Sequence, residues 1–411
     1  MLARILFKIL LFYRFIKKKL RRHALYNGNI TIPPFVFKNM KNVRTLLLTL
    51  SVGVILTTGS VYAQKQKPRS TPPKQQLVPQ QDRAAEGVKK IDEGKYDEAI
   101  AIFDNLLLNE PASTLYKYEK AFALYLKQDY RAASDIFKTI TSAQDSDPRY
   151  YQLLGNCYDY LGEQENAVFT YQEGLKKFPN SGRLFMELGT VEMSRHDFGQ
   201  AVMYWENGIS AEPQFASNYY WAARFHAKTR EKIWALIYGE LFLNLEPDTK
   251  RSAEISELLF EIYKSALASG PDSTGLLKFS RQRTIISGGD PTRQPFELVY
   301  ETAMTDAVRP LLQENPPTDL EMISRLRAEF LKQWEAESYG EMHPNILFER
   351  HAEMLKAGVF QAYNYWLLHR GAPDDFKKWA LANRAEFQRF TSWVQKNPLV
   401  LTQEYKFNRY E

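Results

Sequence analysis

Apolar residues recur every three or four positions through most of the chain that follows residue 80. Two clear examples begin at Ile255 and Ile323, where this spacing places the apolar side chains on one face of a helix. No run alternates apolar and polar residues between turn signals, so no β-sheet is predicted. The pattern predicts an all-α protein, with C-terminal helices near residues 250–268, 295–313, 320–338, 345–357, 360–369 and 375–396.

Shorter signals mark the ends of these helices. Thr318, followed three residues later by Glu321, predicts a capping box at the start of a helix. Segments 287–291 and 315–317 are rich in Gly and Pro and predict loops. The tail from Leu399 to Tyr410 is expected to be extended and packed back on the helices.

A longer period of 34 residues runs through residues 80–247. It is carried by five alanines: Ala99, Ala133, Ala167, Ala201 and Ala235. A large aromatic residue stands four positions after each of the first four: Phe103, Phe137, Tyr171 and Trp205. The same step separates a second set of small residues, Gly87, Ala121, Gly155, Gly189 and Ala223, and four prolines share the phase, Pro111, Pro179, Pro213 and Pro247. Such a period predicts five repeats, each made of two antiparallel helices.

The spacing has a physical cause, because a small residue on one helix lets the partner helix approach closely. Gly94 and Gly162 lie in the predicted turns between paired helices, where glycine takes the left-handed conformation that ends a helix. The fifth repeat departs most from the pattern, with Gly239 where an aromatic residue is expected. Departure at an end is typical of a repeat that meets a different neighbour.

These landmarks resemble those of the tetratricopeptide-repeat (TPR) family. The resemblance implies a helical solenoid whose concave groove is lined by the first helix of each pair and binds a protein or peptide. Carried over position by position, the groove residues are Tyr118, Phe122, Tyr125, Arg149, Gln152, Asn156, Asp159, Arg183, Met186, Tyr220 and Arg224.

Three of these residues, Arg149, Arg183 and Arg224, suggest a partner with acidic groups, because arginine can hold a carboxylate with two hydrogen bonds. The alternative is that each is an ordinary solvated position. TPR proteins that grip a C-terminal carboxylate resemble one another in a set of Lys and Asn residues, of which only Asn156 is matched here.

The charge of +6 does not describe the folded part of the chain. Eleven of the 54 Lys and Arg lie in residues 1–63 and four more in residues 64–79, whereas the first of the 48 Asp and Glu is Asp82. Residues 80–411 therefore carry a net charge of −9. A nucleic-acid-binding domain normally has a basic face of its own, so nucleic acid is not an expected partner.

Residues 40–63 have the pattern of a signal peptide, with a basic start, an apolar stretch, and small residues at Val61 and Ala63. Cleavage would leave Gln64 as the first residue. Either translation starts at Met40, or residues 1–39 form a long cationic leader and 45–63 stay as an uncleaved membrane anchor. Both interpretations predict an exported protein of the periplasm or cell envelope of a Gram-negative bacterium, with no other membrane contact.

The chain thus divides into four parts: a leader (1–63), a Pro/Gln/Lys-rich linker (64–79), five TPR repeats (80–247) and a C-terminal helical domain (248–411). From Asp248 onwards the chain also loosely resembles exported TPR proteins of the Bacteroidota.

Candidate chemistry is sparse. The chain has no His-Glu-x-x-His, Gly-x-Ser-x-Gly or P-loop motif. A metal site is conceivable where His343, Glu349, His351 and Glu353 cluster, but a solvated helix with surface charges is the favoured interpretation. The only cysteine, Cys157, falls inside a repeat helix and is expected to be a small core residue. No active site, cofactor or metal is predicted, and the protein is not expected to be an enzyme.

Two hypotheses for function remain open. The first is a non-enzymatic interaction scaffold that uses the groove. The second gives the C-terminal domain a small catalytic or ligand-binding site, to which the repeats recruit a substrate. Within that domain, the aromatic segment Phe360–Leu368 is either a docking surface or, as favoured, a central helix covered by Trp334, Trp379 and Trp393. A deep pocket with converging carboxylates or histidines would support the second hypothesis, and a filled core the first.

Overall fold

The computed structural model describes residues 80–271, 276–280, 294–313 and 319–405. Over these ranges all eighteen elements are α-helices, and the only β-structure is an isolated bridge between Pro271 and Leu277. The all-α prediction is confirmed. The predicted leader, linker and loops at 287–291 and 315–317 lie outside the described residues. The chain divides into two compact units, Met1–Gly94 and Lys95–Glu411.

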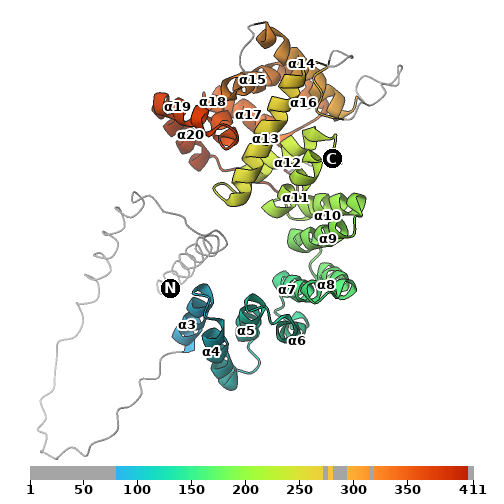
Figure 1. Ribbon diagram of the computed structural model, residues 1–411, viewed down its shortest axis with the longest axis vertical. Helices are drawn as coiled ribbons and strands as arrows, with labels where there is room; N and C mark the ends of the chain where they lie inside the picture. The colour runs from blue at the N-terminus through green and yellow to red at the C-terminus, as the bar shows by residue number, and fades with distance from the viewer. Residues whose placement is uncertain (1–79, 272–275, 281–293, 314–318, 406–411) are drawn as a thin grey trace, which may run out of the picture. The chain divides into compact units, whose positions relative to one another are not determined.

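Ten helices correspond to the five predicted pairs. In the first unit, α3 (Gln80–Asp92) is the first helix of repeat one. The second unit contains its partner and the other four pairs, which follow one another as a stack (Figure 1). They are α4 (Tyr96–Asn109), α5 (Thr114–Leu126), α6 (Tyr130–Thr141), α7 (Pro148–Tyr160), α8 (Gln164–Lys177), α9 (Gly182–Ser194), α10 (Phe198–Ala211), α11 (Ala216–Ala227) and α12 (Lys232–Leu245).

From the second repeat onwards, the periodic small residues lie where the paired helices touch. All five alanines of the 34-residue series are completely buried. A Cβ atom added to Gly155 would lie 2.2 Å from the ring of Tyr171, and one added to Gly189 would lie 2.3 Å from that of Trp205. Each glycine therefore makes room for the large aromatic residue of its own repeat, as the spacing predicts.

The turns between paired helices also follow the prediction. Gly94 and Gly162 have φ of +75° and +76°. One period away, the same place is taken by Gln128 and His196, with φ of +70° and +63°. These two side chains adopt a left-handed conformation that glycine adopts more easily.

Eight helices follow the repeats: α13 (Lys250–Ser269), α14 (Phe296–Leu312), α15 (Leu320–Ala336), α16 (Tyr339–Met342), α17 (Ile346–Lys356), α18 (Phe360–Leu368), α19 (Pro373–Ala382) and α20 (Arg384–Lys396). The helix predicted over 375–396 is in fact two helices. They are separated at Asn383 (φ −115°, ψ 39°), whose side-chain amide donates to Trp379 O. Such local bonds compete with helix continuation. The cap of α15 is Asp319 rather than Thr318, and α16 was not predicted.

The stack of repeat helices continues into α13. Arg251 donates to Ser217 and the Tyr220 hydroxyl donates to Glu254, each across a sequence separation of 34 residues. Leu259 of α13 fills the space beside Gly239, where an added Cβ would lie 2.7 Å from it. Packing against α13 therefore explains why the fifth repeat lacks an aromatic residue at this position.

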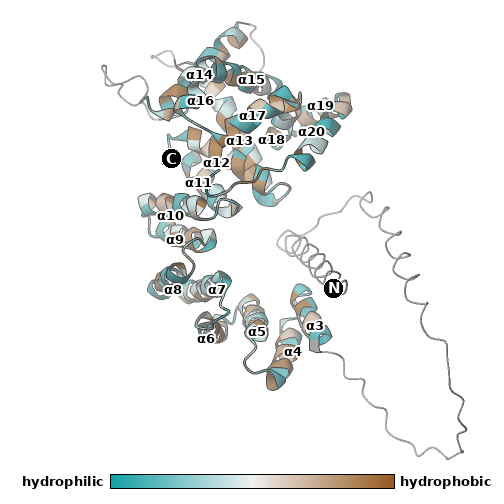
Figure 2. Cartoon of the chain, turned by 180° about the vertical axis from the view of Figure 1, so that it is seen from behind, coloured by the Kyte–Doolittle hydropathy of each residue, from teal (hydrophilic) through white to brown (hydrophobic). Residues whose placement is uncertain are grey.

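The hydrophobic core is divided between two clusters, and the boundary lies within the repeats. One cluster extends from Tyr118 to Val191, through repeats two to four. The other begins at Ala201 on α10 and extends to Leu401. Its centre is α12, in which every residue from Ile233 to Leu243 is buried; the apolar colouring of α12 and α13 is visible in Figure 2. The last repeats and the C-terminal helices thus share one core.

The tail packs back on the helices, as predicted, as far as Tyr405. Leu401 is buried, and its carbonyl accepts a hydrogen bond from Gln214 in the connection between α10 and α11. The Tyr405 hydroxyl donates to Glu349 on α17. No helix in the described ranges is both long and apolar enough to cross a membrane.

Candidate functional site

The aromatic end of the predicted groove lies on α5. Tyr118, Phe122 and Tyr125 follow one another on one helix face, with ring centroids 6.0 and 6.5 Å apart. Tyr118 is 7% exposed and packs against Phe137 and Tyr150, so it forms the base of the cluster. Phe122 and Tyr125 are half-buried.

Two tyrosines that sequence reasoning missed extend this cluster towards solvent. Tyr160, at the end of α7, is 61% exposed and lies 6.0 Å from Tyr125. Tyr130, the first residue of α6, stacks on Tyr160 with ring centroids 4.6 Å apart. We call Phe122, Tyr125, Tyr130 and Tyr160 the aromatic wall. Tyr160 could have been found from its place beside the predicted groove residue Asp159.

The polar half of the groove is internally bonded. Arg149 donates through Nε and Nη2 to the two oxygens of Asp147, at 2.8 and 2.9 Å. Burial would raise the pKa of Asp147, but its hydrogen bonds with Arg149 outweigh that effect and lower the pKa. Gln152 donates to Glu187, and Asn156 accepts from the Tyr171 hydroxyl at 2.6 Å.

The three arginines differ in how their charge is compensated. Arg149 is paired with Asp147, and Arg224 lies 2.7 Å from Glu254. Arg183 donates to the neutral Gln152 at 2.9 Å and lies over the ring of Phe215. Among the described residues, no carboxylate lies within ion-pairing distance of Arg183. The charge of Arg183 acts on the nearby carboxylates of Asp147 and Glu187, so the predicted positive stripe reduces to one guanidinium with no direct ion pair.

Tyr220 and Arg224 belong to the junction between repeat five and α13. Tyr220 is 6% exposed and lies under the guanidinium groups of Arg224 and Arg251. Burial, together with its hydrogen bond to Glu254, raises the pKa of Tyr220 to about 12. These contacts tie α11 to α13 and leave little of Tyr220 for a partner.

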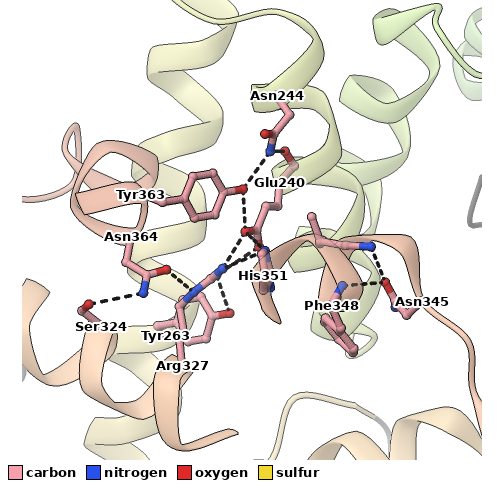
Figure 3. A network of polar contacts seen from close by, with 11 residues as sticks. Glu240, Asn244, Tyr263, Ser324, Arg327, Asn345, Phe348, His351, Tyr363 and Asn364 are labelled. Atoms are coloured by element: carbon pink, nitrogen blue, oxygen red, sulfur yellow. Dashed lines mark hydrogen bonds and ion pairs between the residues drawn. The ribbon is translucent and has the colours of Figure 1, made fainter. Parts of the chain in front are cut away.

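A second group of polar residues is buried among the C-terminal helices (Figure 3). Glu240 of α12 accepts two hydrogen bonds from Arg327 of α15, and one each from His351 of α17 and Tyr363 of α18, the last two at 2.7 and 2.8 Å. Arg327 also donates to Tyr263 of α13 and to Asn364, and Asn244 donates to Tyr363. One charged network thus joins the last repeat to four later helices.

In this network, opposite charges stabilise the ionised form of the buried carboxylate of Glu240. Burial would raise the pKa of Glu240, but Arg327 and His351 lower it strongly. Burial lowers the pKa of His351, which favours its neutral form. The cavity beside these groups measures about 10 Å³ and is lined mainly by apolar side chains, including Tyr300, Phe330 and Phe348. Such a space is roughly that of one water molecule, so a substrate-sized pocket is not present here.

The residues that sequence analysis considered as a metal site each have different partners in the structure. His351 belongs to the buried network, His343 bonds Gln294 O, and Glu349 accepts from Tyr405. The described residues contain no group of three His, Cys, Asp or Glu placed to hold a metal ion. Cys157 is completely buried, and burial raises the pKa of its thiol to about 12.

The aromatic segment Phe360–Leu368 is α18 and lies inside the C-terminal bundle. Seven of its nine residues are buried. Tyr365 stacks on Trp379 at 4.4 Å, as predicted, and Trp366 packs on Phe390. Trp334 has other ring partners, among them Phe330 and Phe348. The filled core supports the favoured interpretation of this segment.

Comparison with known proteins supports the assignment of tetratricopeptide repeats in part of the chain. Residues 90–157 match the tetratricopeptide repeat family model. The Hsp70-Hsp90 organising protein of Plasmodium falciparum is 32% identical over 133 residues, which are 32% of this chain and 52% of that protein. Tetratricopeptide repeat protein 21B of Mus musculus is 27% identical over 124 residues, or 30% of this chain. The match spans only 9% of that relative's length.

Among solved structures, the chain is similar to TTC0263, a thermophilic TPR protein of Thermus thermophilus. The identity is 18% and the TM-score 0.38, with 44% of this chain and 98% of the other covered. The sequence matches support the TPR assignment predicted from the 34-residue period.

Proposed function

We propose, on the basis of these tetratricopeptide repeats, that the protein is a non-enzymatic scaffold that binds a protein or peptide partner along its groove. Repeats of this kind mediate protein–protein interaction in relatives such as the Hsp70-Hsp90 organising protein. The sealed network at Glu240 and the filled core around α18 support a scaffold rather than a catalytic role for the C-terminal helices.

One observation carries the choice of partner. Arg183 is half-buried on the groove helix α9, and its hydrogen bond to Gln152 uses only Nη1. The guanidinium group has five N–H donors, so most of its capacity remains for a ligand. We therefore expect an acidic side chain of the partner to bind at Arg183.

The location of this scaffold is part of the proposal. The signal pattern at residues 40–63 supports export to the cell envelope, with any membrane contact made by that segment. Intact-mass measurement of the native protein tests it, because cleavage leaves Gln64 as the first residue. A native chain that still contains Thr45–Ala63 would exclude cleavage.

Charge reversal tests the binding site. The tagged protein is used to capture partners from an envelope extract, with Arg183→Glu compared against Arg230→Glu, a reversal at an exposed arginine between α11 and α12. We expect Arg183→Glu to abolish capture, Arg230→Glu to preserve it, and capture to weaken with salt, which screens exposed charges over about 10 Å at 0.1 M. Capture that survives Arg183→Glu with unchanged affinity rejects the groove as the binding site.

A further inference from the structure

The aromatic wall presents unused binding capacity at the groove. Tyr130 and Tyr160 stack on each other, and within the described residues neither hydroxyl has a hydrogen-bond partner. Tyr160 is 61% exposed. An exposed aromatic ring such as that of Tyr160 adds little to the stability of the fold, whereas tyrosine is enriched where partners bind.

The charges beside the wall favour a cation. Asp129 directly precedes Tyr130, Asp159 directly precedes Tyr160, and both are exposed. The two nearby cations are each held by a carboxylate: Lys127 by Asp97 at 2.6 Å, and Arg131 by Glu163 at 2.6 Å. In the part of the chain that the structure describes, neither Asp129 nor Asp159 forms an ion pair, although Asp129 caps α6 by accepting from the Ala132 N–H and its charge acts on Lys127. The surroundings of the wall are therefore negative after internal pairing.

A proline-rich peptide fits this combination. An extended polyproline II segment has no internal hydrogen bonds, so its carbonyls are free to accept from the two tyrosine hydroxyls. Its proline rings pack on aromatic-lined grooves, a recurring mode of peptide recognition. A lysine or arginine in the same segment would face Asp129 and Asp159.

The position of Arg183 adds a register. The wall extends over α5, α6 and α7, and Arg183 of α9 bonds Gln152 of α7, eight residues before Tyr160 on that helix. Eight residues of an α-helix rise about 12 Å and packed helices lie about 8–10 Å apart, so this rise combined with one to two helix spacings gives roughly 14–23 Å. A polyproline II chain advances about 3.1 Å per residue, so this distance corresponds to roughly five to eight residues.

From these four features we infer that the groove recognises an extended, proline-rich segment of a partner protein in which a basic residue is followed or preceded, five to eight residues away, by an acidic one. The inference rests on the proposed function of the groove and specifies its ligand. The prolines and the base bind at the wall, and the acid binds at Arg183.

Synthetic peptides test the pattern on the intact protein. The probe is a ten-residue, fluorescently labelled polyproline peptide with one Lys and one Asp six residues apart, and its Kd is measured by anisotropy. We expect Tyr160→Ala to weaken binding roughly twofold to tenfold, because an aromatic contact contributes about 0.5–1.5 kcal/mol and 1.4 kcal/mol is tenfold in Kd. Asp159→Asn should weaken binding and reduce its salt dependence. Phe169→Ala, which removes a ring that is 63% exposed on α8, is the matched control and should leave Kd unchanged.

A second pair of probes tests the register. A peptide with Lys and Asp two residues apart should bind more weakly than the six-residue spacing, and Arg183→Glu should abolish this difference. Equal binding of both spacings, of a Lys→Glu probe, or of the Tyr160→Ala variant refutes the inference. If partner capture still depends on Arg183 while the probe fails, the ligand pattern is wrong and the groove function stands.

Discussion

Two arginine–carboxylate pairs, each made of two hydrogen bonds, lie in opposite settings in this chain. Arg149 and Asp147 form a two-point pair on the groove, with side chains 43% and 32% exposed. Arg327 and Glu240 form one in the C-terminal core, with both side chains 4% exposed. The first pair is exposed to solvent and neutralises charge on a surface. The second is buried, and the network around it links five helices. The same pairing is therefore solvent-exposed on the proposed binding groove and buried where the C-terminal helices meet.

The largest expected effect follows from breaking the buried pair. Arg327→Ala leaves Glu240 buried without its main partner, and removing one member of a buried pair typically costs about 3–5 kcal/mol. Urea unfolding of the variant measures this loss. Lys332→Ala, on the same helix but in an exposed pair with Glu329, is the control and should change the free energy of unfolding by no more than about 1 kcal/mol.

A double variant provides a second test of this pair if Arg327→Ala does not fold. Replacing both partners, as in Glu240→Leu with Arg327→Met, removes the uncompensated charge. It should be less destabilising than Arg327→Ala alone, because a buried pair can often be exchanged for apolar residues at little cost. A double variant as unstable as the single one would mean that the pair is not the source of the effect.

In the groove region, stability is expected to come from apolar packing instead. Ala167 is completely buried between the helices of repeat three. Ala167→Phe overpacks this contact and should cost roughly 1–3 kcal/mol. Thermal unfolding measures the change, with Phe169→Ala, an exposed position two residues away, as the control. Equal midpoints for Ala167→Phe and the native protein would show that the 34-residue register is displaced.

The repeats and the C-terminal helices differ in how much of their packing could be predicted from the sequence. In the repeats, the 34-residue period predicts that the same contact between paired helices recurs in each repeat. The sequence alone therefore indicated that Ala167, Gly155 and Tyr171 lie at one such contact. The network around Glu240 joins residues more than 80 positions apart in a region with no period. The signal available was Glu240 itself, an acid in an otherwise apolar run from Ile233 to Leu243, but its partners could not be inferred.

The groove shows the same contrast on a smaller scale. The sequence placed Arg149, Arg183 and Arg224 at groove positions, and all three lie on first helices. Their compensation could not be foreseen for Arg224, because its partner Glu254 belongs to α13, beyond the predicted repeats. The break at Asn383 was also missed, since the apolar spacing continues across it.

We expect His351, in the buried network around Glu240, to make stability depend on pH. The pKa of His351 is lowered because the ring is buried, and Arg327 and Arg350 add to this effect while Glu240 opposes it. In the unfolded chain the imidazole titrates near 6.5. The unfolded state therefore binds more protons than the folded state as the pH falls below about 6.5, and stability decreases.

Comparison with His351→Gln isolates this contribution. Urea unfolding at several values between about pH 7.5 and pH 5 should show the native protein losing stability faster than the variant as the pH falls. The measurement is confined to this window because most carboxylates remain ionised there. Parallel curves for the two proteins would show that His351 is not protonated differently in the folded and unfolded states.

The smallest change in the free energy of unfolding is expected for the solvent-exposed pair of Arg149 and Asp147. Arg149→Ala removes the same two hydrogen bonds from a carboxylate as Arg327→Ala does. Asp147, however, is partly exposed, so water can replace the guanidinium, and it still accepts the backbone N–H of residue 149 as the cap of α7. Pairs of this kind contribute about 0–1 kcal/mol, so the free energy of unfolding should change by no more than that. A loss of the size expected for Arg327→Ala would show that the groove pair also fixes the fold, and the contrast between the exposed and the buried pair would fail.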